Sequence, residues 1–267
     1  MDTKAKPYIG VTGLTTETEV NQVLGDFSRA GYSTETPHVP MLGFLVSRDT
    51  LNHHLPPNRR YPPIEKLRSL LYDAKGKALA MIHYHEREGD ALDMHIRRLF
   101  DGTGIHQDDL CRTLQLNVHI PDPAQVRSIK DKFDDMQIVL QLNHKILECH
   151  DPDEIARLVQ EYGDSIDYVL IDPSGGKGLE LDIPFSAAIY RELKEQSPRL
   201  TIGFAGGFTS KNVKKRLRTL KSLLGTTDFS IDAEGGLREL LSDKFGDDIL
   251  IQGEVERYLI DAHTQLA

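Results

Sequence analysis

The sequence predicts a protein of the α/β class, a (β/α)8 TIM barrel that forms a single domain over residues 1–267. A chain of 267 residues has the length of one such barrel, and strand-like segments alternate with helical ones along nearly all of it. Three successive strand-like segments near the C-terminus end in polar, glycine-rich loops. Parallel strands of a barrel all end on one face, so we expect these loops to form the rim of an active site.

The elements are predicted from the spacing of apolar residues and from helix-start signals. Residues 8–12 form the first strand, and residues 16–30 form a helix with Val20, Val23 and Phe27 on one face. Asp151-Pro152 is typical of a helix start, because aspartate caps free N–H groups and proline fits the first turn. The other strands are expected at 42–46, 78–83, 114–118, 138–142, 168–172, 200–204 and 229–232. The other helices are expected at 64–72, 124–133, 154–162, 185–196, 212–224 and 255–265, with an extra helix at 91–100 in the long connection 86–109.

Paired glycines at two strand ends indicate a phosphate-binding cup. The strand that ends near Phe204 runs into Gly206-Gly207, and Thr209-Ser210 then opens a helix. Glycines let the main chain approach an anion closely, and the first N–H groups of a helix have no internal partner. The next strand ends in a second pair. We therefore expect phosphate binding at Gly206, Gly207, Gly235 and Gly236, although tight strand-to-helix turns are the alternative.

Composition and charge limit the classes of partner. The net charge is −9, with 39% hydrophobic and 27% charged residues, which argues against an extended nucleic-acid surface. The basic run 211–221 alternates with Val213, Leu217 and Leu220 and is interpreted as the solvated face of an outer helix. No apolar run reaches 18 residues, so we expect a cytoplasmic protein with no membrane partner. Cys111 and Cys149 are expected to be free thiols without a catalytic role.

Taken together, the strand ends resemble the phosphoribosylanthranilate isomerase family of (β/α)8 enzymes. The likeness extends over essentially all eight units. The matching segments are Ile9-Gly-Val-Thr-Gly-Leu-Thr15, Gly43-Phe44, Arg60-Tyr61-Pro62, Leu114-Gln115-Leu116-Asn117, Leu170-Ile171-Asp172 with Gly175-Gly176-Lys177-Gly178 and Asp182, Ala205-Gly206-Gly207 with Asn212-Val213, and Ser230-Ile231-Asp232 with Gly236.

The resemblance implies an Amadori rearrangement of an aminoaldose phosphate to an aminoketose phosphate. An acid protonates the ring oxygen and a base moves a proton from the sugar C2, so neither a metal nor a cofactor is expected. The acid of the family corresponds to Asp172, and its base is a cysteine at the position of Thr12. A threonine hydroxyl lacks the accessible pKa of a thiol and cannot take a carbon-bound proton without a partner base.

Further residues follow from the same resemblance. Substrate contacts are expected from Arg60, Gln115, Asn117, Gly175, Gly176, Lys177 and Asp232, with Asp232 read chiefly as an orienting residue. The chain departs from the family where Asn117 replaces histidine and where Glu234-Gly235 replaces a small hydroxyl pair. The loop after the second strand is also longer. A carboxylate at Glu234 would repel phosphate unless it turns away or is paired.

Several residues allow more than one interpretation. Asp172 is either the catalytic acid or a cap of the turn that follows it. His83 and His85 face the same way on a strand, and they form a polar surface pair, a substitute base at His83, or a metal site with Glu86. His53, His54 and His95 are expected to face solvent. Arg59 is chemically equivalent to Arg60 as a partner for a carboxylate, and Lys177 either holds phosphate or is exposed.

The preferred function is therefore an aldose-ketose isomerase of the phosphoribosylanthranilate isomerase type or a divergent relative, acting as a monomer or homodimer on a small phosphorylated sugar. Its catalytic residues would be Asp172 with Thr12 or His83. Two alternatives stay open on the same scaffold, because a barrel supports many chemistries. One is a lyase or glycosyl-bond hydrolase that uses Asp172, and the other is a binding protein without catalysis.

Overall fold

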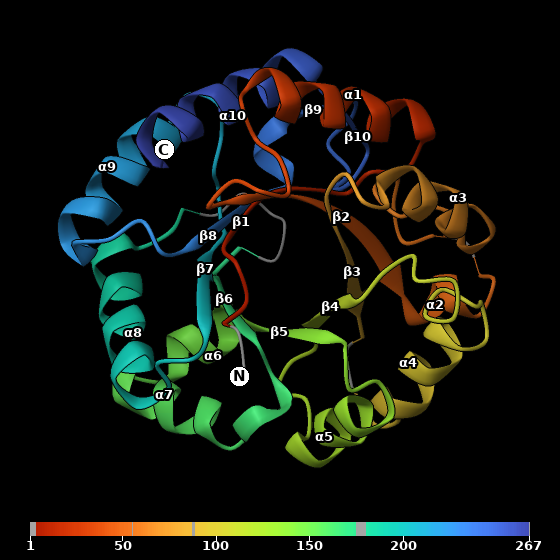
Figure 1. Ribbon diagram of the computed structural model, residues 1–267, viewed down its shortest axis with the longest axis horizontal. Coiled ribbons are helices and arrows are strands. Elements are labelled where there is room, and N and C mark those ends of the chain that lie inside the picture. Colours follow the sequence, from red (N-terminus) through yellow and green to blue (C-terminus); the bar gives the residue numbers. More distant parts are fainter. Residues whose placement is uncertain (1–3, 55, 87–88, 175–179, 267) are drawn as a thin grey trace.

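The computed structural model describes residues 4–54, 56–86, 89–174 and 180–266, and it is a closed barrel of eight parallel strands (Figure 1). Each strand pairs with its neighbour in sequence order, and β1 closes the barrel by pairing with β8. The predicted single-domain TIM barrel is confirmed. The strands are β1 (Tyr8–Thr12), β2 (Val39–Ser47), β3 (Leu79–His85), β4 (Thr113–Asn117), β5 (Gln137–Asn143), β6 (Tyr168–Asp172), β7 (Thr201–Phe204) and β8 (Ser230–Ala233).

Helices surround the barrel and pack against the outer face of the sheet (Figure 1). Their starts match the capping signals: Thr16 and Asp151 each form a reciprocal capping box, and Pro152 occupies the first turn. The helices are α1 (Glu17–Arg29), α2 (Arg48–Leu51), α3 (Ile64–Ala74), α4 (Leu92–Phe100), α5 (Pro123–Lys132), α6 (His144–Cys149), α7 (Pro152–Gln160), α8 (Ile183–Gln196), α9 (Val213–Leu224) and α10 (Gln252–Leu266), with 3-10 turns η1 (Gly163–Ser165) and η2 (Gly235–Leu237).

Two features of the sequence-based prediction need correction. The helix expected as an addition between β3 and β4 is α4, which is itself the crossover helix of that unit. The prediction also missed the short helices α2 and α6 and an antiparallel hairpin of β9 (Arg238–Leu240) and β10 (Asp248–Leu250). These segments are too short for a periodic pattern to reveal them, since a helix signal needs about ten residues.

Side chains inside the barrel form an apolar layer below a polar one. Residues two apart on a strand share a face, so Met81 and His83 both point inward from β3. The apolar layer fills the N-terminal half with Tyr8, Val39, Met41, Met81, Val139, Tyr168 and Leu170. The C-terminal half instead holds polar side chains of the same strands. The site described below therefore lies on this packed apolar layer, which we call the floor of the barrel.

Candidate active site

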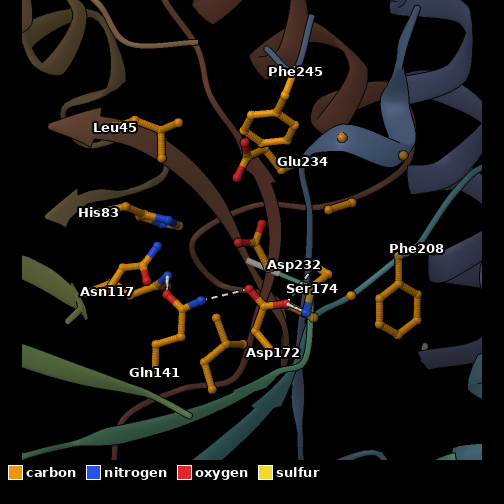
Figure 2. A pocket seen from close by; sticks show the side chains of 18 of the residues that line it. Leu45, His83, Asn117, Gln141, Asp172, Ser174, Phe208, Asp232, Glu234 and Phe245 are labelled. Carbon is orange, nitrogen blue, oxygen red and sulfur yellow. Dashed lines mark hydrogen bonds between the residues drawn. The ribbon is translucent and has the colours of Figure 1, made fainter. Parts of the chain in front are cut away.

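A pocket opens at the C-terminal ends of the strands, where the polar layer of the barrel meets the loops (Figure 2). Its empty space, counted together with the part that is open to solvent, is about 680 Å³. Figure 2 shows Asp172 and Asp232 close together, with His83 and Asn117 across the pocket and Phe245 beside Glu234. The lining residues are Leu45, Asn58, Tyr61, His83, Gln115, Asn117, Gln141, Leu170, Asp172, Ser174, Ala205, Gly206, Gly207, Phe208, Asp232, Ala233, Glu234, Gly235, Gly236 and Phe245.

Asp172, at the end of β6, is held by hydrogen-bond donors on both of its oxygens. Oδ1 accepts from the backbone N–H of Ser174 at 2.9 Å and from its hydroxyl at 2.7 Å, and Oδ2 accepts from Nε2 of Gln141 at 2.7 Å. Gln141 in turn accepts from Nε2 of Gln115 at 3.0 Å. Asp172 therefore caps the following turn and also lines the pocket. Donors on both oxygens suit a carboxylate rather than a carboxylic acid.

Asp232, at the end of β8, is in a different environment although it lies in the same pocket. Its carboxyl oxygens each lie 3.0 Å from the hydroxyl of Thr12, which is fully buried. Burial raises the pKa of Asp232 to about 7, the hydrogen bond from Thr12 lowers it, and the nearby charges of Glu234 and Asp172 raise it further. Asp232 thus keeps a proton that an ordinary aspartate would release near pH 4.

Two glycines create the space in which Thr12 and Asp232 meet. A Cβ on Gly10 would overlap the Asp232 carboxyl group and the end of Met41, and a Cβ on Gly43 would overlap the Thr12 side chain. Strands β1 and β8 are paired through Gly10 and Asp232, so the close approach follows from the register. Because these glycines have no side chains, the Thr12 hydroxyl on β1 can reach the Asp232 carboxyl group on the neighbouring strand β8.

The glycine turns after β7 and β8 are in contact, and both line the pocket. The carbonyl of Gly206 accepts from Nη1 of the buried Arg216 at 2.6 Å, and that of Gly207 accepts from Nδ2 of Asn212 at 2.8 Å. In a trans peptide the N–H of the next residue points opposite to the carbonyl, so these bonds turn the N–H groups of Gly207 and Phe208 away from Arg216 and Asn212. Among the described residues, no acceptor is found for the N–H of Gly206, Gly207, Gly235 or Gly236. A Cβ on Gly236 would overlap the Phe208 carbonyl, so the two turns touch.

Arg60 lies in a buried ion-pair cluster with residues of the β9–β10 hairpin. Its Nε and Nη2 bind both oxygens of Asp248 at 2.6 to 3.2 Å, and its Nη1 donates to Glu234 at 2.6 Å. Arg238 also donates to Asp248, at 3.1 Å. Glu234 is therefore paired rather than left beside a phosphate. Arg59 is instead exposed and pairs with Asp247.

The histidines are placed differently from one another. His83 is buried with its ring toward the pocket, and burial lowers its pKa to about 3, so the imidazole is neutral. No partner is found for its Nε2 in the described part of the chain. Nδ1 of His85 lies 3.2 Å from the carbonyl of Asn117. The expectation that His95 faces solvent is wrong, because its ring packs against the buried Glu86 at 3.0 Å; His53 and His54 are exposed as expected.

The remaining predicted features are the glycine loop after β6, a metal site, the cysteines and the basic segment. Gly175, Gly176 and Lys177 lie outside the described residues. In the described ranges, no group of three or more His, Cys, Asp or Glu side chains is arranged to hold a metal, and no helix is long and apolar enough to cross a membrane. Both cysteines are free thiols, and burial raises the pKa of Cys111 to about 12. The apolar face of the basic segment packs as helix α9.

Sequence reasoning missed several lining residues. Gln141 is an inward residue of β5, and its alternation with Val139 was a usable signal. Ser174 follows Asp172 by two residues, a common spacing for a side-chain cap. Phe245 of the pocket lining and Asp248, the partner of Arg60, carried no comparable signal, because the hairpin that places them was not predicted.

Comparison with solved structures shows the same fold in known isomerases. The N-(5'-phosphoribosyl)anthranilate isomerase of Pyrococcus furiosus matches with a TM-score of 0.63 at 17% identity, over 97% of this chain and 99% of the other. The phosphoribosyl anthranilate isomerase of Thermus thermophilus matches with a TM-score of 0.63 at 14% identity, over 95% and 97%. The YdjI aldolase of Escherichia coli K12 matches with a TM-score of 0.53 at 12% identity, over 98% and 89%. No protein-family model and no curated protein matches the sequence. These likenesses establish the barrel, which isomerases and aldolases share.

Proposed function

We propose that this protein is an aldose-ketose isomerase that rearranges a phosphorylated sugar amine. The observation that supports this function best is a pair of carboxyl groups with contrasting surroundings, Asp172 and Asp232, in one pocket with two glycine turns. The full-length likeness to phosphoribosylanthranilate isomerases agrees with it. An Amadori rearrangement needs one group to give a proton and one to take it, and this pocket offers both.

The phosphate would bind at the contacting turns of Gly206, Gly207, Gly235 and Gly236. All four glycines line the pocket, and the buried guanidinium of Arg216 lies behind Gly206. A cup of main-chain donors backed by a positive charge favours an oxyanion. The sugar would then extend from β7 and β8 toward Asp172, Asp232 and the neutral His83, whose Nε2 has no partner among the described residues and could bind a sugar hydroxyl.

The surroundings of the two carboxyl groups suggest their roles. Asp232, which holds its proton up to about pH 7, gives that proton to the ring oxygen as the bond from C1 to this oxygen breaks and leaves an iminium ion. Asp172, held as a carboxylate, takes the proton from C2. The resulting enolamine gains a proton at C1 and loses the proton of its C2 hydroxyl group, which leaves the C2 carbonyl of the aminoketose. This assignment reverses the role that the family resemblance implies for Asp172, and Thr12 becomes the residue that positions Asp232.

Turnover in D2O tests this function. The protein is mixed with the N-(5-phosphoribosyl) derivatives of anthranilate and of aniline, and NMR follows the appearance of an aminoketose with deuterium at C1. We expect turnover of at least one compound, and Asp172→Asn and Asp232→Asn should each lower it by about 10²-fold or more. Asp131→Asn, a matched change on the exposed surface of α5, should leave it unchanged.

Other outcomes would contradict the isomerase. Release of the free amine and sugar phosphate without a ketose would identify a glycosyl-bond hydrolase. Binding of both compounds without any product would identify a binding protein. Full activity in Asp232→Asn would contradict its role as the proton donor.

A further inference from the structure

The guanidinium of Arg60 is committed to carboxylates of the protein itself. Its side chain is 4% exposed, and that of Asp248, which it binds through Nε and Nη2, is fully buried. Its Nη1 donates to Oε1 of Glu234, and its face lies against the ring of Phe245 at 4.8 Å. A ligand carboxylate at this guanidinium would have to share it with Glu234 and Asp248.

The charges of this cluster already balance. Arg60 and Arg238 contribute two positive charges, and Asp248 and Glu234 contribute two negative ones, with all four side chains at most 20% exposed. The described pocket lining adds Asp172 and Asp232 but no lysine or arginine. A further anion at this end of the pocket would face Glu234 without a free cation among the described lining residues, and like charges in contact are strongly unfavourable where water is excluded.

The same end of the pocket suits an uncharged group. Phe245 and Leu45 supply apolar surface, and Asn58 and Tyr61 supply polar atoms. Oε2 of Glu234 has no hydrogen bond to a described residue and can accept one from a ligand N–H or O–H. With phosphate held between β7 and β8, a ligand that passes the two aspartates reaches these residues, which belong to strand β2, the β2–α3 loop, the hairpin and the end of β8.

We propose that the pocket takes a phosphosugar amine whose nitrogen substituent is an uncharged ring without a carboxylate, and that Glu234 excludes the carboxylated form. This inference rests on the proposed function, since it assumes a phosphosugar amine in the pocket. It narrows the substrate to a class other than anthranilate derivatives. Glu234 acts here as a specificity residue, because it both neutralises Arg60 and faces the ligand.

A matched pair of unreactive ligands tests the inference. Titration calorimetry compares 1-anilino-1-deoxyribitol 5-phosphate with its 2-carboxyphenyl counterpart on the full-length chain. We expect the uncharged compound to bind at least about tenfold more tightly than the carboxylated one. Glu234→Gln keeps an oxygen that can accept from Arg60 but removes the charge, so it should bring the two affinities close together. Glu239→Gln removes the same charge from the exposed strand β9 and should leave the preference intact.

The outcomes separate this inference from the proposed function, because the reduced ligands cannot isomerise. Equal binding of the two ligands, tighter binding of the carboxylated one, or no binding of either would overturn it. If Glu239→Gln lost the preference for the uncharged ligand as fully as Glu234→Gln, the inference would also be overturned, because the preference would then depend on the overall charge of the protein. A preference for the uncharged ligand in a protein that turns over neither ribosyl amine would leave the specificity intact and reject the isomerase.

Discussion

At the scale of single residues, the site depends on the different surroundings that the fold gives to two aspartate side chains. Asp172 and Asp232 both lie near the end of a strand. Asp172 accepts from donors on both of its oxygens, whereas the side-chain donor to Asp232 in the described residues is the hydroxyl of the buried Thr12. An aspartate at the end of β6 could be predicted from the sequence. The state of Asp232 could not, because it depends on Thr12, which lies 220 residues away in the chain and is brought into contact by barrel closure.

The raised pKa of Asp232 predicts a specific dependence of stability on pH. Its pKa is about 7 in the folded protein against an ordinary value of 3.8, so between these values the folded state holds a proton that the unfolded chain has released. The free energy of unfolding from this group is therefore greatest below about pH 4 and falls as pH rises through about 7, by on the order of 2–4 kcal/mol.

Urea unfolding of the wild type and Asp232→Asn at pH 5 and pH 8 measures this effect. The wild type should lose more stability than the variant between the two pH values, because asparagine cannot ionise. Asp131→Asn should follow the wild type. Parallel pH dependences of the wild type and Asp232→Asn would show that Asp232 ionises normally in the folded protein.

At the scale of elements, the β9–β10 hairpin is what distinguishes this pocket from a plain barrel rim. Its loop delivers Phe245 to the pocket, and the carbonyl of Gly246 accepts from the N–H of Arg59 in the β2–α3 loop at 3.2 Å. The long β2–α3 loop was predicted from the sequence, but the β9–β10 hairpin that contacts it was not. The strands of the hairpin are three residues each, which is too short for alternation to be recognised.

Gly246 tests the docking of these two loops. It has φ +77°, and a Cβ there would also overlap the side chain of Asn58. Gly246→Ala should lower the free energy of unfolding by more than the roughly 1 kcal/mol expected of a left-handed backbone alone, and it should weaken ligand binding. Gly225→Ala is the matched control, because Gly225 has φ +68° with nothing within 4 Å of the added Cβ.

Urea unfolding and calorimetry with 1-anilino-1-deoxyribitol 5-phosphate give both quantities. If the two variants lose the same stability and bind the ligand equally well, the contact between the hairpin and the β2–α3 loop contributes nothing to the site.

At the scale of the whole molecule, most of the architecture could be predicted because each βα unit is a local pattern repeated along the chain. Strands β1 and β6 match their predicted bounds, and the other strands differ by a few residues. What local patterns could not reveal is how the inward side chains sort into layers. The apolar floor joins side chains from β1, β2, β3, β5 and β6, and the polar layer above it becomes a site only when all strands are in register.

This arrangement predicts that the barrel unfolds as one unit and that its floor supports the pocket. Met81→Ala removes a fully buried side chain from the floor and should lower the free energy of unfolding by about 2–5 kcal/mol, whereas Met94→Ala, on the exposed face of α4, should change it by less than about 0.5 kcal/mol. Circular dichroism and tyrosine fluorescence, the usable intrinsic probe in a chain without tryptophan, should report one shared transition for each protein. Because strands β1 to β8 form one closed hydrogen-bonded ring, loss of packing at the floor cannot stay local to β3. Two separate transitions in Met81→Ala, or a stability equal to that of Met94→Ala, would show that the floor and the rim of the barrel are not coupled.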